Sequence, residues 1–316
     1  MTEITANTTF SQQINQILRI PSPLQKLNDK IFDEKSIKVF VKRDDLIHPE
    51  ISGNKWRKLK YNLLNASHLG YRSILTFGGA YSNHIYATAA AGKYFDFETI
   101  GIIRGDELNI NSSQTLKFAT ECGMKLHFVT RNDYRAMREN PQNHPLIQSF
   151  IHSKIVPEGG TNESALGGVG EMVDEITEQL GYAPDYIICP VGTGGTISGI
   201  IAKSAIKTQV IGICVLKNGH YLQEEVSRLV ESNVGYQKHN FEILWDCHHG
   251  GYAKKTPQLM NFIEAFYEKY SFEIEYIYSG KMFFAFDELI KSKIMPNSTV
   301  VLIHTGGIQG LQLKNE

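Results

Sequence analysis

The sequence predicts an α/β protein built from open, mainly parallel twisted sheets wrapped by helices. Short apolar runs rich in β-branched residues alternate with helix-like runs along the 316 residues of the chain. This alternation is typical of parallel strands joined by helical crossovers. Such sheets bind their ligands at the carboxyl ends of the strands. We therefore expect a functional site in the segments that directly follow the strands.

The expected elements follow from these runs in order. The expected strands are Ile37–Lys42, Ser73–Phe77, Glu98–Ile103, Lys125–Val129, Tyr186–Val191, Gln209–Val215 and Thr299–His304. The expected helices are Lys55–Ser67, Asn83–Phe95, Ser113–Cys122, Gly168–Leu180, Thr196–Ala205, Tyr221–Glu231, Pro257–Tyr270 and Lys281–Lys291. The strands in the middle third of the chain, between Ser73 and Val129, predict a separate lobe. The polar segment Asn132–Pro145 would separate this lobe from the apolar run that follows.

The composition excludes several classes of protein. A net charge of −1, with no run of Lys or Arg longer than a pair, argues against a nucleic-acid or membrane partner. The four cysteines are scattered and lack the spacing of a zinc or redox motif, so no metal is expected. Residues 1–13 lack a signal-peptide pattern, and no apolar run approaches the roughly 18 residues of a membrane helix. We expect a cytoplasmic protein.

A single lysine follows a small, flexible turn in the stretch Ser52-Gly53-Asn54-Lys55. Glycine allows backbone conformations that are closed to other residues. A helix-like run begins directly after the turn. The pattern predicts that the turn presents Lys55 at the mouth of a cleft instead of on a helix face.

A glycine-rich loop follows the expected strand Tyr186–Val191 and precedes a helix; it consists of Gly192, Thr193, Gly194, Gly195 and Thr196. Ile197 stands where the third glycine of a dinucleotide motif would be, and no Gly-Lys-Ser/Thr of a Walker loop follows. The pattern favours a cradle for one terminal phosphate over a tight turn that binds nothing. A positioned amine together with a phosphate cradle indicates a phosphorylated aldehyde cofactor, with pyridoxal 5′-phosphate (PLP) the first candidate.

Three further patterns are weaker. Ser82 is a good N-cap for the helix after it, and a helix N-terminus attracts a carboxylate, although capping alone also explains it. Tyr252 and Tyr278 could take part in acid–base chemistry, but packing accounts equally well for two of 15 tyrosines. His304-Thr305-Gly306-Gly307 is a polar turn at a strand end, where α/β sites are built.

These motifs, in this order, resemble those of the 1-aminocyclopropane-1-carboxylate (ACC) deaminase and D-cysteine desulfhydrase family, within the fold type II PLP enzymes. The resemblance extends over nearly the whole chain. Its most specific parts are the Gly53-Asn54-Lys55-Trp56-Arg57-Lys58-Leu59 and Ser82-Asn83-His84 runs. It implies a homodimer and two lobes with PLP in the cleft between them. We place the larger PLP-binding domain at residues 1–50 plus 159–316 and the smaller inserted domain at 51–158.

The resemblance also implies roles for individual residues. Lys55 would hold the cofactor as a Schiff base and later move the α-proton. Ser82, Asn83 and His84 would lie at the cofactor ring and the substrate carboxylate, with Asn83 bonding the ring hydroxyl. The loop from Gly192 to Thr196 would hold the phosphate. The further assignments are that Tyr252 and Tyr278 flank the substrate, and that Ser279 or Thr305 sits near the pyridine nitrogen.

Two positions distinguish the branches of this family. The deaminase branch typically has Glu after the second tyrosine and Leu after the histidine of the His-x-Gly-Gly turn, whereas the desulfhydrase branch has Ser or Thr at both. A carboxylate at the pyridine nitrogen strengthens the electron sink more than a hydroxyl does, and opening a cyclopropane needs the stronger sink. Ser279 and Thr305 therefore favour a D-cysteine desulfhydrase that forms pyruvate, hydrogen sulfide and ammonia.

Other activities remain open on the same residues. They are ACC deaminase, which forms 2-oxobutanoate and ammonia, a racemase-type activity, and a binding module that has lost its chemistry. Tyr81 stands where the family commonly has Gln, which leaves the substrate open more than the cofactor.

Overall fold

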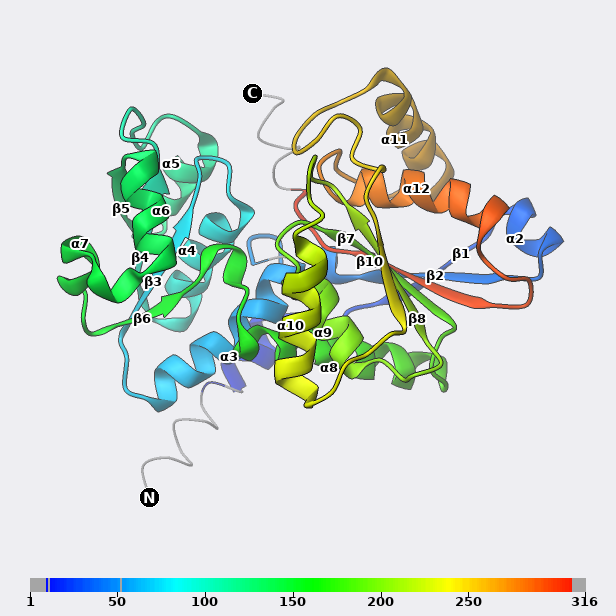
Figure 1. Ribbon diagram of the computed structural model, residues 1–316, viewed down its shortest axis with the longest axis horizontal. Helices are drawn as coiled ribbons and strands as arrows, with labels where there is room; N and C mark the ends of the chain where they lie inside the picture. The colour runs from blue at the N-terminus through cyan, green and yellow to red at the C-terminus, as the bar shows by residue number, and fades with distance from the viewer. Residues whose placement is uncertain (1–9, 11, 52, 309–316) are drawn as a thin grey trace. The chain divides into compact units, whose positions relative to one another are not determined.

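The computed structural model describes residues 10, 12–51 and 53–308, and the chain divides into two compact units (Figure 1). The smaller unit contains the described residues up to Ile20, His48–Ile51 and Lys55–Ala165. The larger unit contains Pro21–Ile47, the Gly53-Asn54 turn and the described residues from Leu166 onward.

The larger unit is built on a six-stranded sheet with the order β1-β2-β10-β7-β8-β9 (Figure 1). Its strands are β1 (Leu24–Leu27), β2 (Lys38–Arg43), β7 (Tyr186–Val191), β8 (Gln209–Cys214), β9 (Phe241–Leu244) and β10 (Thr299–His304). All neighbouring strands are parallel except β1, which runs antiparallel to β2. Leu302 on β10 lies opposite both Val41 and Ile188, so the last strand occupies the centre of the sheet.

Helices cover both faces of this sheet. They are α2 (Lys30–Glu34), α8 (Glu163–Leu180), α9 (Gly195–Lys203), α10 (Leu222–Val234), α11 (Pro257–Tyr270) and α12 (Ser279–Ser292). Val300 and Leu302 pack against the side of α11 and α12, whereas Val301 and Ile303 pack against the side of α8, α9 and α10. Alternate residues of β10 thus serve two cores, which explains why the strand is a continuous apolar run.

The smaller unit is built on a four-stranded, fully parallel sheet with the order β5-β4-β3-β6. Its strands are β3 (Ser73–Gly78), β4 (Glu98–Arg104), β5 (Lys125–Val129) and β6 (Ser153–Val156). Its helices are α3 (Asn54–His68), α4 (Asn83–Phe95), α5 (Gln114–Glu121), α6 (Arg131–Glu139) and α7 (Pro145–Gln148). Short 3₁₀ turns complete the two units at η1 (Asp44–Leu46), η2 (Pro141–Asn143) and η3 (Glu158–Gly160).

The expected fold class, mainly parallel sheets wrapped by helices, is confirmed. The polar segment Asn132–Pro145 was expected to separate the three βα units of the middle third from the next run, and this expectation is wrong. Most of it forms α6, which begins at a Thr130 N-cap and buries Tyr134 and Met137 on one face. After α6 and α7 the chain returns to the same sheet as β6. The four-residue strands β1, β6 and β9 were not expected, because runs this short carry too few apolar residues to show a period.

The N-terminal segment groups differently from the division expected at residues 1–50. Described residues up to Ile20 belong to the smaller unit. The ring of Phe10 lies 5.1 Å from that of Phe95 in α4, and Phe95 in turn stacks on Trp56 in α3. Burial of these aromatic rings ties the segment to the smaller unit.

Two glycines on adjacent helices of the larger unit are expected to respond oppositely to alanine. A Cβ on Gly199 in α9 would lie 2.5 Å from the Cβ of Val169 in α8. Gly199→Ala should therefore lower the free energy of unfolding by about 1–3 kcal/mol. A Cβ on Gly170 in α8 would meet only the Lys203 side chain at 3.5 Å. Gly170→Ala should raise stability by about 0.5–1 kcal/mol. Urea unfolding measures both, and shifts of the same sign would contradict this packing.

Candidate active site

The backbone of Gly53 and Asn54 is pinned to several strand ends of the larger unit. The N–H of Gly53 donates to the carbonyl of Asp44 at 2.9 Å, after β2, and the N–H of Asn54 donates to the carbonyl of Thr305 at 3.2 Å, after β10. The Asn54 side-chain amide donates to Thr196 Oγ1 at 2.9 Å, at the start of α9. A Cβ on Gly53, whose φ is +66°, would lie 1.9 Å from the Thr305 carbonyl oxygen. Only glycine permits this approach.

Lys55 follows this pinned turn and lies in the first turn of α3. The expectation that the turn itself would present Lys55, instead of a helix, is therefore wrong. The helix starts one residue earlier than expected, because Asn54 already takes helical geometry. The amine is consequently carried by the first turn of a helix whose start is held by the contacts of Gly53 and Asn54.

The glycine-rich loop joins β7 to α9 as expected. Gly194 is the N-cap of α9 and has a φ of +77°, so the first helical residues are Gly195 and Thr196. A Cβ on Gly192 would lie 3.0 Å from the Tyr278 ring. Backbone N–H groups in the first turn of a helix have no partner within the helix, and they attract anions. The loop can thus hold a phosphate with its backbone.

The turn after β10 rests on a buried histidine. His304 Nδ1 accepts from the N–H of Gly306 at 3.2 Å, and Nε2 contacts the carbonyl of Glu273 at 2.8 Å. This pairing requires the proton on Nε2. Asp45 Oδ1 lies 3.6 Å from His304 Nδ1, and this carboxylate forms a bidentate pair with Arg43 at 2.9 and 2.7 Å. The bond between His304 and Gly306 spans Thr305, whose side chain is buried and whose carbonyl meets Asn54.

The buried side chain of Glu275 caps the backbone at the start of α12. This carboxylate accepts from the backbone N–H groups of Ile277, Tyr278 and Ser279 at 2.6, 2.9 and 2.7 Å. Burial raises the pKa of Glu275, and the N–H groups of Ser279, Ile277 and Tyr278 oppose that rise. The carboxylate thereby fixes the backbone that carries Tyr278 and Ser279.

Tyr252 lies on a tightly wound loop that Lys281 supports. His249, Gly250, Gly251 and Ala253 all have positive φ values. The buried Lys281 amine donates to the carbonyl of Gly251 at 2.7 Å. The ring of Tyr252 packs edge-on against that of Tyr278, with centroids 5.9 Å apart. The two tyrosines predicted from sequence are therefore neighbours, which favours a shared role over unrelated packing.

The smaller unit holds its own set of polar residues. Ser82 is the N-cap of α4, as expected, and its hydroxyl accepts from the N–H of Ile85 at 3.3 Å. Asn83 is the first residue of α4. His84 Nε2 lies 2.9 Å from Thr76 Oγ1, and Nδ1 is a buried atom without a hydrogen-bond partner among the described residues.

Lys58, one helical turn after Lys55, is fully buried in the same unit. Its amine reaches Thr161 Oγ1 at 3.5 Å. Burial, and then the charge of Lys55, hold the pKa of Lys58 well below its usual range. Burial and the same two lysines hold the pKa of His84 well below its usual range. These charge effects place Lys55, Lys58 and His84 near one another in this unit.

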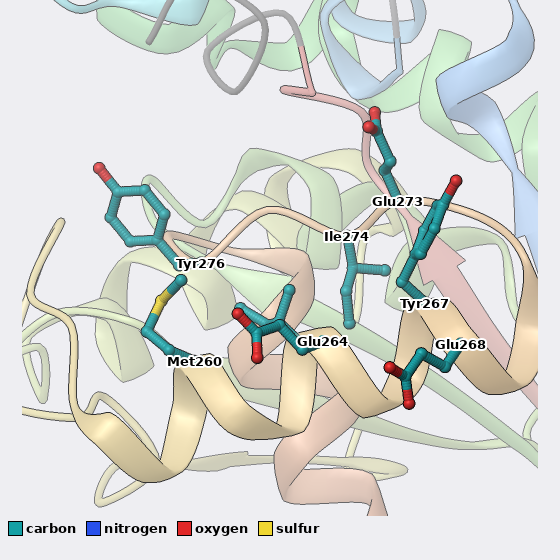
Figure 2. Close-up of a pocket in the computed structure, with 8 residues that line it drawn as sticks. Met260, Glu264, Tyr267, Glu268, Glu273, Ile274 and Tyr276 are labelled. Carbon is teal, nitrogen blue, oxygen red and sulfur yellow. The ribbon is translucent and has the colours of Figure 1, made fainter. Parts of the chain in front are cut away.

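A separate hollow of about 420 Å³ lies beside α11 in the larger unit (Figure 2). Its lining residues are Met260, Ile263, Glu264, Tyr267, Glu268, Glu273, Ile274 and Tyr276. Three of these side chains are carboxylates, which repel a phosphate. This hollow is therefore a poor site for an anionic cofactor.

The comparisons with known proteins decide the family. The pyridoxal-phosphate dependent enzyme family matches this chain over residues 17–306. The chain belongs to this family. A protein of Arabidopsis thaliana named bifunctional D-cysteine desulfhydrase/1-aminocyclopropane-1-carboxylate deaminase, mitochondrial, is 27% identical over 314 residues, which cover 93% of this chain and 78% of the relative.

Two further likenesses agree with this assignment. A D-cysteine desulfhydrase of Klebsiella pneumoniae is 24% identical over 319 residues, covering 94% of each chain. The crystal structure of an ACC deaminase homologue superposes with a TM-score of 0.78 at 24% identity, covering 97% of this chain and 98% of that one. The predicted PLP cofactor and the fold type II architecture are confirmed.

The residues present suit PLP, the cofactor of the family. The glycine loop at the N-terminus of α9 offers backbone N–H groups to a phosphate, and a side chain at Gly192 would crowd the Tyr278 ring. Lys55 supplies an amine for the aldehyde. Among the described residues, no group of three or more His, Cys, Asp or Glu side chains could hold a metal ion.

Sequence reasoning missed three residues of this PLP enzyme. Lys58, Glu275 and Lys281 are charged side chains buried beside predicted site residues. Each lies within four residues of a motif residue, at a spacing that a helix or a cap brings together. Their burial is the signal of a role, and burial of a charge cannot be read from a single sequence.

No helix in the described part of the chain is both long and apolar enough to cross a membrane.

Gly53→Ala tests the pinned turn. The added methyl would overlap the Thr305 carbonyl, so we expect loss of more than about 3 kcal/mol of stability and loss of bound PLP. Gly70→Ala is the matched control, because its φ is +76° and a Cβ there has nothing within 4 Å. This control should cost only about 1–2 kcal/mol, the penalty of a left-handed residue. Equal losses of stability and of PLP absorbance in both variants would contradict the close approach.

Lys281 should make stability depend on alkaline pH. Burial lowers its pKa from 10.5 to about 8, although Glu275 and Cys214 act in the opposite direction. Burial, and then the charge of Lys281, lower the pKa of His249. Between pH 8 and 10.5 the unfolded chain binds the proton that the folded chain releases, so folding becomes more favourable as pH rises through this range.

Lys281→Met should remove this component of the pH dependence. The difference between the urea midpoints of wild type and variant is expected to grow from pH 8 to 10.5 and then level off. A difference that stays constant over that range would show that Lys281 keeps its ordinary pKa.

Proposed function

We propose that this protein is a PLP-dependent lyase that converts D-cysteine and water to pyruvate, hydrogen sulfide and ammonia. The observation that carries the proposal is the Gly53-Asn54 turn, which is pinned at the strand ends directly before Lys55. The family supplies the cofactor, and the relatives named D-cysteine desulfhydrase support the substrate. Ser279 and Thr305 carry hydroxyls where a stronger electron sink would call for a carboxylate.

Each group of residues has a distinct task in this proposal. Bound PLP supplies an electrophilic aldehyde and an electron sink for charge that develops at the substrate α-carbon. Lys55 binds that aldehyde and, once displaced, moves the α-proton. The loop from Gly192 to Thr196 holds the phosphate. Tyr252 and Tyr278 flank the substrate and assist proton movement at the leaving group.

The smaller unit contributes recognition. Ser82 and Asn83 stand at the N-terminus of α4, where exposed N–H groups and the helix dipole favour the substrate carboxylate. Because the pKa of His84 is held low, its imidazole is neutral near neutral pH and can hydrogen-bond without adding charge. Asn83 is assigned to the ring hydroxyl of the cofactor.

ACC deamination is the second candidate activity. The Arabidopsis relative is named for both activities, which supports a site that accepts either substrate. Tyr81, 74% exposed at the start of the segment before α4, replaces the usual Gln at a position next to Ser82 and can alter which substrate fits.

The location and assembly proposed for the protein are the cytoplasm and a homodimer. The four cysteines, of which Cys189 and Cys214 are buried, are all free, as suits a reducing compartment. The homodimer is supported by the family resemblance.

Lys55→Ala is the direct test of the function. PLP-loaded wild type should form pyruvate and sulfide from D-cysteine, with a lower rate of 2-oxobutanoate from ACC. Lys55→Ala should lose at least about a thousandfold in rate, because it removes both the cofactor linkage and the proton carrier. The exposed Lys93→Ala on α4 is the matched control and should keep the full rate. Full turnover by Lys55→Ala would refute the proposal.

A further inference from the structure

The loop that carries Tyr252 has a backbone that depends on contacts from outside the loop. His249 and Ala253 have φ values of +50° and +55°, which residues other than glycine rarely adopt. Backbone in such conformations persists where the surrounding contacts fix it. Tyr252 itself is 46% exposed, so burial does not set the direction of its side chain. That direction therefore depends on what holds the peptide group before Tyr252.

The peptide group that joins Gly251 to Tyr252 is held firmly. Its carbonyl accepts from the Lys281 amine at 2.7 Å and from the N–H of Lys254 at 3.1 Å. Gly251, with a φ of +119°, also packs closely, because a Cβ there would lie 3.3 Å from the Lys217 Cβ. Since a peptide group is planar, fixing the carbonyl of Gly251 also fixes the N–Cα bond of Tyr252.

Lys281 reaches this carbonyl from the first turn of α12. It lies three residues after Tyr278, the N-cap of this helix, so both residues belong to one helix start. The rings of Tyr252 and Tyr278 pack edge-on, with an angle of 71° between their planes. One helix start thus carries one tyrosine of the pair directly and holds the backbone of the other through a hydrogen bond.

The burial of Lys281 points to a role beyond packing. The side chain is fully buried, and among the described residues its amine has one hydrogen-bond acceptor, the carbonyl of Gly251. Burying an amine is unfavourable unless it is hydrogen-bonded, and burial lowers the pKa of Lys281 to about 8. An apolar side chain would fill the same space without this cost. An apolar side chain could not, however, hold the Gly251 carbonyl.

We propose that Lys281 is a positioning residue that acts through the Gly251 carbonyl to orient Tyr252 for proton movement at the substrate leaving group. This inference rests on the proposed function, which places Tyr252 beside the substrate. No covalent bond to Lys281 forms or breaks, because its amine only donates a hydrogen bond. Lys281 thus contributes to turnover without touching the substrate.

A double-mutant cycle in the full-length, PLP-loaded protein tests this. Lys281→Met removes the donor and should lower kcat for D-cysteine by about 10–100-fold, with less than about a threefold change in KM. Tyr252→Phe removes the phenol and should lower kcat at least as much. Because Lys281 acts through Tyr252, adding Lys281→Met to Tyr252→Phe should lower kcat by less than about a further twofold.

Hydrogen exchange of the protein without PLP gives a readout that needs no turnover. Amides of the 248–254 loop should exchange at least about tenfold faster in Lys281→Met, because the loop opens more often. Lys238→Met is the matched control, since its amine also donates to backbone carbonyls, at the end of α9. Lys238→Met should keep both the wild-type exchange of the loop and the wild-type kcat.

Several outcomes would overturn the inference. If Lys281→Met lowers kcat as much in the Tyr252→Phe background as in wild type, Lys281 does not act through Tyr252. Wild-type exchange of the loop in Lys281→Met would show that this hydrogen bond does not hold it. If Lys281→Met does not fold, Gly251→Ala moves the same peptide group against Lys217 and leaves Lys281 in place. An unchanged kcat in Gly251→Ala also counts against the inference.

The failure of the proposed function looks different. Wild type that turns over neither D-cysteine nor ACC would overturn the function and, with it, the role of Lys281. Wild type that turns over D-cysteine, at a rate that Tyr252→Phe leaves unchanged, would overturn only the role of Lys281.

Discussion

The close approach of Gly53 to the Thr305 carbonyl is the constraint on which the site depends. The contact leaves no room for a side chain, and the neighbouring hydrogen bonds tie the turn to Asp44, Thr305 and Thr196. Asp44 follows β2, Thr305 follows β10 and Thr196 lies in the first turn of α9. Strand ends that are distant in sequence are thereby joined at the residue just before Lys55, and the chemistry proposed for Lys55 depends on that junction.

Two helix starts in the larger unit differ in what their backbone N–H groups bind. At the start of α12, the side chain of Glu275 accepts from the N–H groups of Ile277 and Ser279. The start of α9 follows Gly192 and Gly194, with no acidic side chain in its first turn. The phosphate-binding role that we propose for the glycine-rich loop therefore belongs to the start of α9, whereas the Glu275 side chain fixes the backbone of Tyr278 and Ser279.

Much of this arrangement could be predicted from the sequence, because its signals are local. Strands such as Tyr186–Val191 and Thr299–His304 were predicted with their observed limits, since both are unbroken apolar runs. The glycine-rich loop and the Ser82 N-cap could be recognised from their residue types and from their places next to expected strands and helices. What escaped prediction depends on three-dimensional burial or on very short runs. Glu275 and Lys58 look like ordinary surface charges in sequence, and the amphipathic helix α6 was hidden by its high polarity.

The position of β10 between β2 and β7 has a consequence for biosynthesis. Val41 must pair with Leu302, a strand made about 260 residues later, so at 5–20 residues per second the emerging chain waits roughly 13–50 s for its central strand. During that interval Val39 and Val41, fully buried in the finished sheet, have their neighbours on β1 but lack those on β10. The smaller unit has a shorter delay, because its strands all lie between Ser73 and Val156. All four strands of the smaller unit can therefore pair before β10 is made.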